Sequence, residues 1–307
     1  MARNRKGEKI DGWLVMDKPL GLSSAHLVAI VRRMLNPLKI GHGGTLDPLA
    51  SGVLPLALGE ATKTVSYVMD GEKTYHFRIR WGEARTTDDG EGEVCATSDI
   101  RPEKSEIEAA LLGFVGKIEQ VPPIFSAVKV EGKRAYDLAR KQIEIELKSR
   151  LVRIDHFRLL GIPDSDNADF EVKCGKGTYV RSLARDLALA LGSVGHVAKL
   201  RRIAVGSFHE NEAISLEKLE ASGHNAKEFV RPITTVLDDI PALAVTEDEA
   251  CRLKQGQRLV LARLAGGRGV GTAIFEDSVV KVMEKEKLVA LARIEDGLIS
   301  PLRVLNL

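Results

Sequence analysis

The clearest pattern along the chain is a helical repeat of apolar side chains between residues 178 and 191. Three- and four-residue intervals would place these side chains on one face of a helix. The positions that share this spacing are Val180, Leu183, Ala184, Leu187 and Leu191. Gly192 follows directly and is a typical residue at which a helix ends, so the pattern predicts an amphipathic helix with a defined stop.

Alternating apolar and polar side chains predict strands elsewhere. Residues 75–81 alternate as a half-buried strand does, and residues 12–16 form a short apolar run typical of a buried strand. Residues 151–160 and 170–174 are also predicted as strands. The segment 163–167 between them is rich in turn-forming residues, so these two strands would be neighbours along the chain.

Two more helices and one loop complete the prediction for the first part of the chain. Ser23 or Ser24 would cap a helix that runs to about Met34, and residues 102–112 form a further helix. Residues 85–93 are rich in Thr, Asp and Gly, so an exposed loop is expected there. Helices and strands are thus mixed, as in an α+β fold.

The pattern changes near residue 241, where short strands and turns replace the longer elements. Glycines punctuate this region at positions 256, 266, 267, 271 and 297. A chain of 307 residues is long enough for two domains. We therefore expect a larger domain over residues 1–240 and a small β-rich domain over residues 241–307.

Composition favours an ordinary globular protein. Hydrophobic residues make up 44% of the chain and charged residues 29%, so a sizeable core is available and extensive disorder is not expected. Lys and Arg number 45 against 43 Asp and Glu, a balance that argues against a polybasic tail. Local basic patches could still bind nucleic acid.

The sequence indicates a reduced, cytosolic protein. Cys95, Cys174 and Cys251 are far apart and form no CxxC pair, so neither a disulfide framework nor a zinc site is expected. The basic start has no apolar segment after it, unlike a secretory signal. No run approaches the length of a transmembrane helix. Nothing in the sequence demands more than a monomer or an obligatory protein partner.

Residues 41–52 combine glycines with a carboxylate, Asp47, and are the strongest candidate for chemistry. Three glycines in four residues allow tight turns and a close approach of the backbone to a ligand. Their spacing is not that of a phosphate-binding P-loop. Taken alone, Asp47 and Pro48 also match a helix cap, and His42 also fits a loop histidine with no chemical role.

Residues 41–63 resemble the signature of the TruB family of tRNA pseudouridine synthases. Blocks typical of that family follow the same order between residues 12 and 206. They are Asp17-Lys18-Pro19 with Gly21 and Ser23; Lys73-Thr74-Tyr75; Val121-Pro122-Pro123 through Ser126-Ala127-Val128-Lys129 and Gly132; Gly175-Lys176-Gly177-Thr178-Tyr179-Val180-Arg181; and Leu200-Arg201-Arg202. Lys141 departs from relatives that commonly carry glycine there, which would affect a turn rather than the chemistry.

The resemblance implies a pseudouridine synthase fold, with a long mixed, largely antiparallel sheet and a central RNA cleft. It also implies that uridine 55 in the TΨC loop of tRNA is extruded from its stack and isomerised to pseudouridine. The N1–C1′ bond breaks and the uracil rejoins through C5. Nothing is oxidised or reduced, so no cofactor or metal is expected.

The resemblance makes Asp47 the nucleophile. An unperturbed aspartate has a pKa of about 3.9 and is already ionised at neutral pH. Attack at the sugar C1′, abstraction of a sugar proton toward a glycal, and attack at uracil C6 remain alternatives.

Two further catalytic residues are implied. Arg181 would pair with Asp47, because a buried carboxylate without a cation becomes protonated; the alternative is a solvated arginine on the helix face. Tyr75 would lay its ring against the target base; the alternative is an inward-facing strand tyrosine.

Other matched positions imply contacts with RNA or with the pocket. His42 would fill the space that the extruded base leaves, while Lys63 and Leu200 would line the pocket; the alternatives are a surface lysine and a core leucine. The remaining residues implied in substrate or RNA binding are Lys18, Lys129, Tyr179, Arg201 and Arg202. Lys133, Arg134 and Arg140 extend the cluster around Lys129, and Lys199 extends the cluster around Arg201; both clusters could equally be solvated faces.

The C-terminal part resembles a PUA-like RNA-binding domain, with a task in gripping the acceptor side of tRNA. Two rival functions stay open: an RNA-folding factor on the same scaffold, and a guide-RNA-dependent synthase of the dyskerin type. A glycoside hydrolase is a distant third, because no second carboxylate stands out near Asp47.

Overall fold

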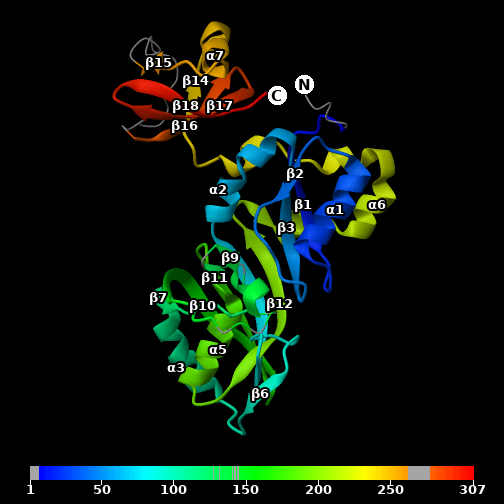
Figure 1. Ribbon diagram of the computed structural model, residues 1–307, viewed down its shortest axis with the longest axis vertical. Helices are drawn as coiled ribbons and strands as arrows, with labels where there is room; N and C mark the ends of the chain where they lie inside the picture. Colours follow the sequence, from blue (N-terminus) through cyan, green and yellow to red (C-terminus); the bar gives the residue numbers. More distant parts are fainter. Residues whose placement is uncertain are drawn as a thin grey trace.

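The computed structural model describes residues 7–126, 128–130, 132–139, 141, 143, 145–261 and 277–307. A long mixed sheet and a smaller C-terminal sheet dominate this part of the chain (Figure 1). The α+β class and the separate β-rich C-terminal unit are therefore confirmed. Gly266, Gly267, Gly271 and Arg140 lie outside the described residues. No helix in the described ranges combines the length and the apolar character needed to cross a membrane.

The long sheet runs through both halves of the larger unit. Its order is β1 (Gly12–Lys18), β3 (Ala50–Leu58), β12 (Gly195–Val205), β4 (Lys73–Trp81), β11 (Asn167–Cys174), β10 (Arg150–Asp164) and β7 (Gly116–Gln120), with β2 (Ile40–His42) on β3 and β13 (Phe208–His209) on β12. The contact between β3 and β12 is parallel, and the other neighbours are antiparallel. The predicted strands are all present, and β10 and β11 extend beyond the predicted limits.

The α-helices flanking this sheet are α1 (Ser24–Leu35), α2 (Val65–Asp70), α3 (Lys104–Leu111), α4 (Ala135–Ala139), α5 (Val180–Ala190) and α6 (Leu216–Ser222). Short 3-10 helices are η1 (Gly59–Lys63), η2 (Leu112–Phe114), η3 (Glu210–Glu212), η4 (Gly223–Phe229) and η5 (Ile233–Val236). Ser23 caps α1 by accepting a hydrogen bond from the His26 N–H at 3.2 Å, as predicted. Gly192 follows α5 with a φ of 70°, which suits glycine.

Two apolar clusters divide the sheet. One packs α3 and α5 against β4, β10 and β11, and the other packs α1 and α6 against β1 and β3 (Figure 1). Tyr75 and Leu200 pack against both clusters, so these two side chains lie where the halves meet. The junction is therefore the part of the sheet that residues from both halves can reach.

The C-terminal unit has its own sheet, ordered β14 (Ala242–Ala244), β16 (Val279–Glu284), β17 (Lys287–Glu295), β18 (Leu298–Val304) and β15 (Leu259–Val260), with helix α7 (Glu247–Lys254). It has a separate core, but a third cluster joins it to the long sheet. Leu288, Leu291 and Leu305 share that cluster with Trp13 and Val15 of β1. The smaller unit is thus docked through buried apolar surface.

Two loop predictions need correction. Residues 85–93 comprise the last residue of β5 (Glu83–Arg85) and its connection to β6 (Val94–Thr97), but Asp89 there is only 6% exposed and bridges to Val197 of β12. Asp47 and Pro48 do not cap a helix, because a turn follows them and leads into β3. In both places contacts with residues that are distant in sequence determine the structure, and local composition does not predict it.

Candidate active site

Arg181, in the first turn of α5, lies at the centre of the site. Its side chain is 6% exposed, and Nη2 lies 2.9 Å from Oδ2 of Asp47. Nη1 lies 3.4 Å from Oδ2 of Asp89 and donates to the Thr87 carbonyl at 3.1 Å, while Nη2 donates to the Phe125 carbonyl at 3.0 Å. The predicted contact between Arg181 and Asp47 is thus present, and the solvated alternative is wrong.

The relative burial of the two side chains is the reverse of the expectation, in which the carboxylate was the buried group. The Asp47 side chain is 41% exposed, whereas Arg181 and Asp89 are 6% and 8% exposed. The buried guanidinium therefore needs compensation for its removal from water, and two carboxylates and two carbonyls provide this compensation. Asp47 keeps an open side that a substrate can reach.

The loop between β2 and β3 is held firmly on both sides of Asp47. The Ser24 hydroxyl accepts from the Leu46 N–H at 2.8 Å and donates to the Leu46 carbonyl at 2.9 Å. After Asp47, the Gly21 N–H donates to the Pro48 carbonyl at 2.8 Å. The start of α1 and the turn before it therefore fix the position of the carboxylate.

Lys18 is a buried cation beneath the same loop. It is 0% exposed, and its Nζ donates to the carbonyls of Pro19 at 2.9 Å, Leu22 at 2.6 Å and Pro48 at 3.5 Å. Burial lowers the pKa of Lys18 to about 8, with Asp47 opposing this shift and Arg202 adding to it. Lys18 therefore supports the loop, and its contact with RNA, implied by the resemblance, stays a prediction.

A pH-dependent stability follows for Lys18. Because the folded pKa is about 8 and the reference value 10.5, the unfolded chain binds more protons between these values, and folding stability rises with pH there. Relative to Lys18→Met, the wild type should gain up to about 3 kcal/mol between pH 8 and pH 10.5. Urea denaturation across that range measures the difference. Lys117→Met, at an exposed position on β7, serves as the control and should show no such trend.

Arg202 of β12 is a second buried arginine. It is 1% exposed, and it donates to the Val53 carbonyl at 2.8 Å and to the Gly44 carbonyl at 3.1 Å. A Cβ at Gly52 would lie 2.2 Å from the Arg202 carbonyl oxygen, so glycine is required where β3 meets β12. Arg202 is thus engaged by backbone carbonyls, and the phosphate contact implied for it stays a prediction.

Tyr75 lies on β4, opposite Arg202 in the register of β4 and β12. Burial raises the pKa of the Tyr75 hydroxyl, while the charge of Arg202 and a hydrogen bond from it oppose the shift, and Asp47 adds to it. The hydroxyl is therefore protonated at neutral pH. Tyr75 is also inward-facing and partly buried, so both expectations for it are compatible with its place at the junction.

A recess opens beside the carboxylate. Its lining residues are Asp47, Leu49, Ala50, Asp89, Arg181, Val197, Ala198, Lys199 and Leu200. The recess has a volume of about 10 Å³, room for roughly one water molecule, so a larger group enters only when the lining side chains move apart. Leu200 thus lies at the pocket, as implied. A larger groove of about 590 Å³ adjoins the recess and shares Leu49, Ala198, Lys199 and Leu200 with it.

His42 ends β2, close to the same loop. Burial and the charge of Arg202 lower the pKa of its imidazole, which is therefore neutral at pH 7. Its Nδ1 is buried and has no hydrogen-bond partner among the described residues. A neutral ring can stack without a charge, which is compatible with the implied space-filling role.

Other implied contact residues are engaged elsewhere. Lys63 donates to Glu60 at 2.6 Å and to the Val304 carbonyl of β18 at 2.7 Å, and it does not line the recess. Arg201 binds both carboxylate oxygens of Asp17, at 2.9 and 3.1 Å, and Glu210 at 2.8 Å. Three of its five N–H donors are therefore engaged by protein carboxylates, and Arg201 also lines the larger groove.

Tyr179 precedes α5 and is held by Gln120. The Tyr179 N–H donates to the Gln120 side chain at 2.8 Å, and the Arg150 guanidinium lies 4.8 Å from the centre of its ring. In the basic cluster around β8 (Lys129–Val130) and β9 (Lys133–Arg134), Lys129 and Lys133 are exposed. These two lysines remain available to an external partner.

Asp88, Asp89 and Arg185 were missed by the sequence analysis. Arg185 of α5 contacts Asp88 at 3.0 Å, four residues after Arg181 contacts Asp89. The sequence does carry a signal for these contacts. Two adjacent acidic residues lie in one loop, and two arginines lie four positions apart on one helix face. Within the described residues, no group of three or more His, Cys, Asp or Glu side chains is placed to hold a metal ion.

Comparison with known proteins identifies the family. The model for the TruB family pseudouridylate synthase N-terminal domain matches residues 32–180. The model for the tRNA pseudouridylate synthase B C-terminal domain matches residues 181–239. The chain belongs to the TruB family.

Full-length TruB relatives support this assignment. Proteins named tRNA pseudouridine synthase B from Rhodospirillum rubrum and from Caulobacter sp. strain K31 are 55% and 51% identical to the chain, over the whole of both chains. Among solved structures, a crystal structure of a Cbf5-Nop10-Gar1 complex matches with a TM-score of 0.71 and 25% identity, over 96% of this chain and 85% of that one. The predicted enzyme class, a pseudouridine synthase of the TruB family, is confirmed.

Proposed function

We propose that the chain isomerises uridine 55 in the TΨC loop of tRNA to pseudouridine, with Asp47 as the nucleophile and without a cofactor. The supporting observation is the contact of 2.9 Å between Asp47 and the buried Arg181, at the mouth of a recess that includes Leu200. The relatives named tRNA pseudouridine synthase B support the choice of substrate.

The roles proposed for the side chains follow from their surroundings. Arg181 orients the Asp47 carboxylate through the ion pair of 2.9 Å. Asp47 then attacks the sugar C1′, abstracts a sugar proton, or attacks uracil C6. In each route the N1–C1′ bond breaks, the uracil turns, the C5–C1′ bond forms, the C5 hydrogen leaves as a proton and N1 gains a proton. Since the recess holds about one water molecule, the target base enters after it leaves the RNA stack and as the lining opens.

The proposal includes the setting of the reaction. The enzyme would act in the cytoplasm as a monomer, with residues 1–240 as the catalytic domain and residues 241–307 as a PUA-like domain that grips the acceptor side of tRNA. Exposed Lys129 and Lys133 would contact phosphates of the T-arm.

The decisive test measures tritium release from a tRNA transcript labelled at uridine C5, with no cofactor and no guide RNA. Release from the transcript with uridine 55, lost when position 55 is cytidine, supports both the activity and the target. Tight tRNA binding without release would favour an RNA-folding factor. Release only after a guide RNA is added would favour a guide-dependent synthase.

Substitutions of Tyr75 separate its ring from its hydroxyl. Tyr75→Phe should keep tRNA affinity, so any loss of rate reports the hydroxyl. Tyr75→Leu should also lose stacking on the base, worth about 1–3 kcal/mol, and should be at least about fivefold slower again. Single-turnover tritium release compares the two variants, with Tyr67→Phe on α2 as a matched control. Normal turnover by Tyr75→Leu would rule out the stacking role.

A further inference from the structure

Residues 82–98, named here the hairpin arm, supply part of the catalytic pair's surroundings. Three consecutive residues of the arm contact two arginines of α5: the Thr87 carbonyl and Asp89 contact Arg181, and Asp88 contacts Arg185. The orientation of Arg181, and through it of Asp47, therefore depends on where the arm lies.

The arm is not held in place by a core of its own. Its strands β5 and β6 form a separate two-stranded sheet, and every residue of β6 is exposed. A two-stranded ribbon with so little buried surface is marginal by itself. Polar contacts at the two ends of the arm must therefore fix it.

One set of contacts ties the arm to β12. The Val197 N–H donates to the Asp88 carbonyl at 3.1 Å, and Nδ1 of His196 lies 2.8 Å from the Glu83 carbonyl oxygen. The first contact holds the outer part of the arm against β12, and the second holds the Glu83 side of its base. The Gly82 N–H also donates to the Val194 carbonyl at 2.8 Å, so the Ser98 side of the base is left to other residues.

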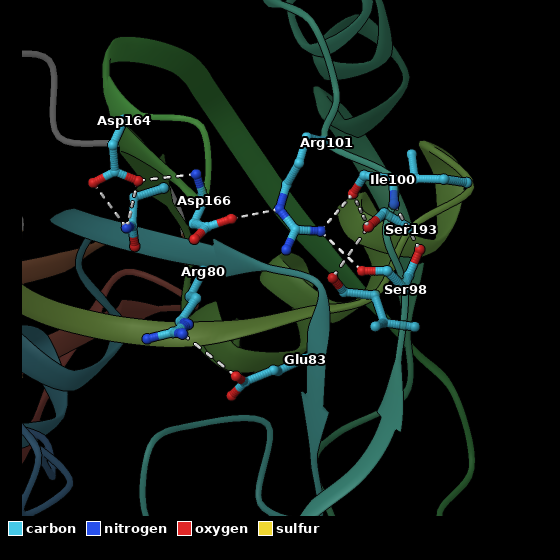
Figure 2. A network of polar contacts seen from close by, with 10 residues as sticks. Arg80, Glu83, Ser98, Ile100, Arg101, Asp164, Asp166 and Ser193 are labelled. Atoms are coloured by element: carbon cyan, nitrogen blue, oxygen red, sulfur yellow. Dashed lines mark hydrogen bonds and ion pairs between the residues drawn. The ribbon is translucent and has the colours of Figure 1, made fainter.

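The base of the arm is closed by Arg101, as Figure 2 shows. Nε of Arg101 donates to Asp166 Oδ1 at 2.6 Å, and Nη1 donates to the carbonyls of Ser98 at 2.8 Å and Ile100 at 3.2 Å. The buried Ser193 donates to the same Ile100 carbonyl at 2.9 Å. One guanidinium thus joins the end of the arm to the turn between β10 and β11.

The other end of the arm, Gly82, is part of the same arrangement. Ser98 N–H donates to the Gly82 carbonyl at 3.0 Å. A Cβ at Gly82 would lie 2.5 Å from both terminal nitrogens of Arg101, and the φ of Gly82 is +86°. The guanidinium therefore occupies the space that a side chain would need, directly beside the point where the arm leaves β4.

We propose that Arg101 is a positioning residue for the Asp47–Arg181 pair. It clamps both ends of the hairpin arm to the β10–β11 turn, and the arm in turn holds Thr87 and Asp89 against Arg181. This inference rests on the proposed function, since its effect is on the rate of isomerisation. The Arg101–Asp166 ion pair lies at the surface, with side chains that are 34% and 46% exposed. This ion pair thereby has a role in orienting the catalytic carboxylate.

Arg80 provides a matched control in the same view (Figure 2). It is an arginine at the same end of the sheet, 48% exposed, and its contact is to Glu83 at 3.4 Å. It joins β4 to the first residue of β5 but does not reach Ser98 or Asp166. The Arg80 variant therefore removes an arginine charge from this region without removing the contacts that Arg101 makes with Ser98 and Asp166.

The test compares Arg101→Met and Arg80→Met by tritium release from tRNA, each alone and with Asp89→Asn. Because small misplacement of a reacting group is costly, we expect Arg101→Met to lower kcat about tenfold with KM changed less than about twofold. Arg80→Met should stay within about twofold of wild type. In the Asp89→Asn background, Arg101→Met should cause a smaller fold loss than in the wild type, since the arm then contacts Arg181 only through the Thr87 carbonyl and a neutral amide.

Several outcomes would overturn the proposal. They are equal rates for Arg101→Met and Arg80→Met, an effect confined to KM, or the same fold loss with and without Asp89→Asn. If thermal denaturation shows that Arg101→Met does not fold, Asp166→Asn, which removes the charge that Nε contacts, replaces it in the same scheme. Absence of release by the wild type would instead refute the proposed function.

Discussion

Tritium release from tRNA is expected to stop when Asp47 is replaced by asparagine. The amide has the same shape and still accepts a hydrogen bond from Arg181, but its oxygen is not a nucleophile and it carries no negative charge. Release over the wild-type time course should therefore be undetectable, whereas tRNA affinity in a filter-binding assay should change less than about threefold.

The control for Asp47→Asn is Asp70→Asn. Asp70 is also an ion-paired aspartate, 2.9 Å from Lys176, but it is exposed and does not line the recess. It should release tritium at the wild-type rate. Wild-type turnover by Asp47→Asn would exclude Asp47 as the nucleophile under any of the three chemical routes.

The second large effect is expected at Arg181. Arg181→Ala leaves the Asp89 carboxylate, 8% exposed, without its cation and leaves Asp47 without its orienting contact. Removing one partner of a buried pair costs about 3–5 kcal/mol. If about 4 kcal/mol of this is lost from the transition state, turnover falls about a thousandfold.

Arg181→Lys distinguishes charge from geometry. Lysine keeps the positive charge but lacks the planar fork that reaches two carboxylates and two carbonyls at once. It should recover part of the lost rate, with tRNA affinity near wild type for both variants. Turnover of Arg181→Ala within a few-fold of wild type would refute the requirement for the ion pair.

Sequence patterns anticipated the elements that carry the site better than the site itself. The amphipathic spacing in α5 and the alternation in β4 reflect burial on one face, which is a local property of the chain. The contact between Asp47 and Arg181, which are 134 positions apart, could be predicted only from the family resemblance. No local pattern reports which residues a distant strand will bring together.

The burial of charged residues was not anticipated by the local sequence patterns. Lys18, Asp89 and Arg202 were expected to be exposed or to contact RNA, because charged side chains are rarely buried. Each is instead satisfied by backbone carbonyls or by an opposite charge. Those partners come from other segments of the chain, so the compensation that makes burial possible is invisible in any single window of sequence.

The apolar cluster between the two sheets has a consequence for how the protein unfolds. Leu288, Leu291 and Leu305 complete a core whose other members include Trp13 and Phe208, and Asn306 N–H donates to Glu60 across the same boundary at 2.8 Å. Neither unit keeps a full core when the other is removed, so local opening of one exposes apolar surface of both. The chain passes from one sheet to the other near residue 240, but we expect the two units to unfold together because they share this cluster.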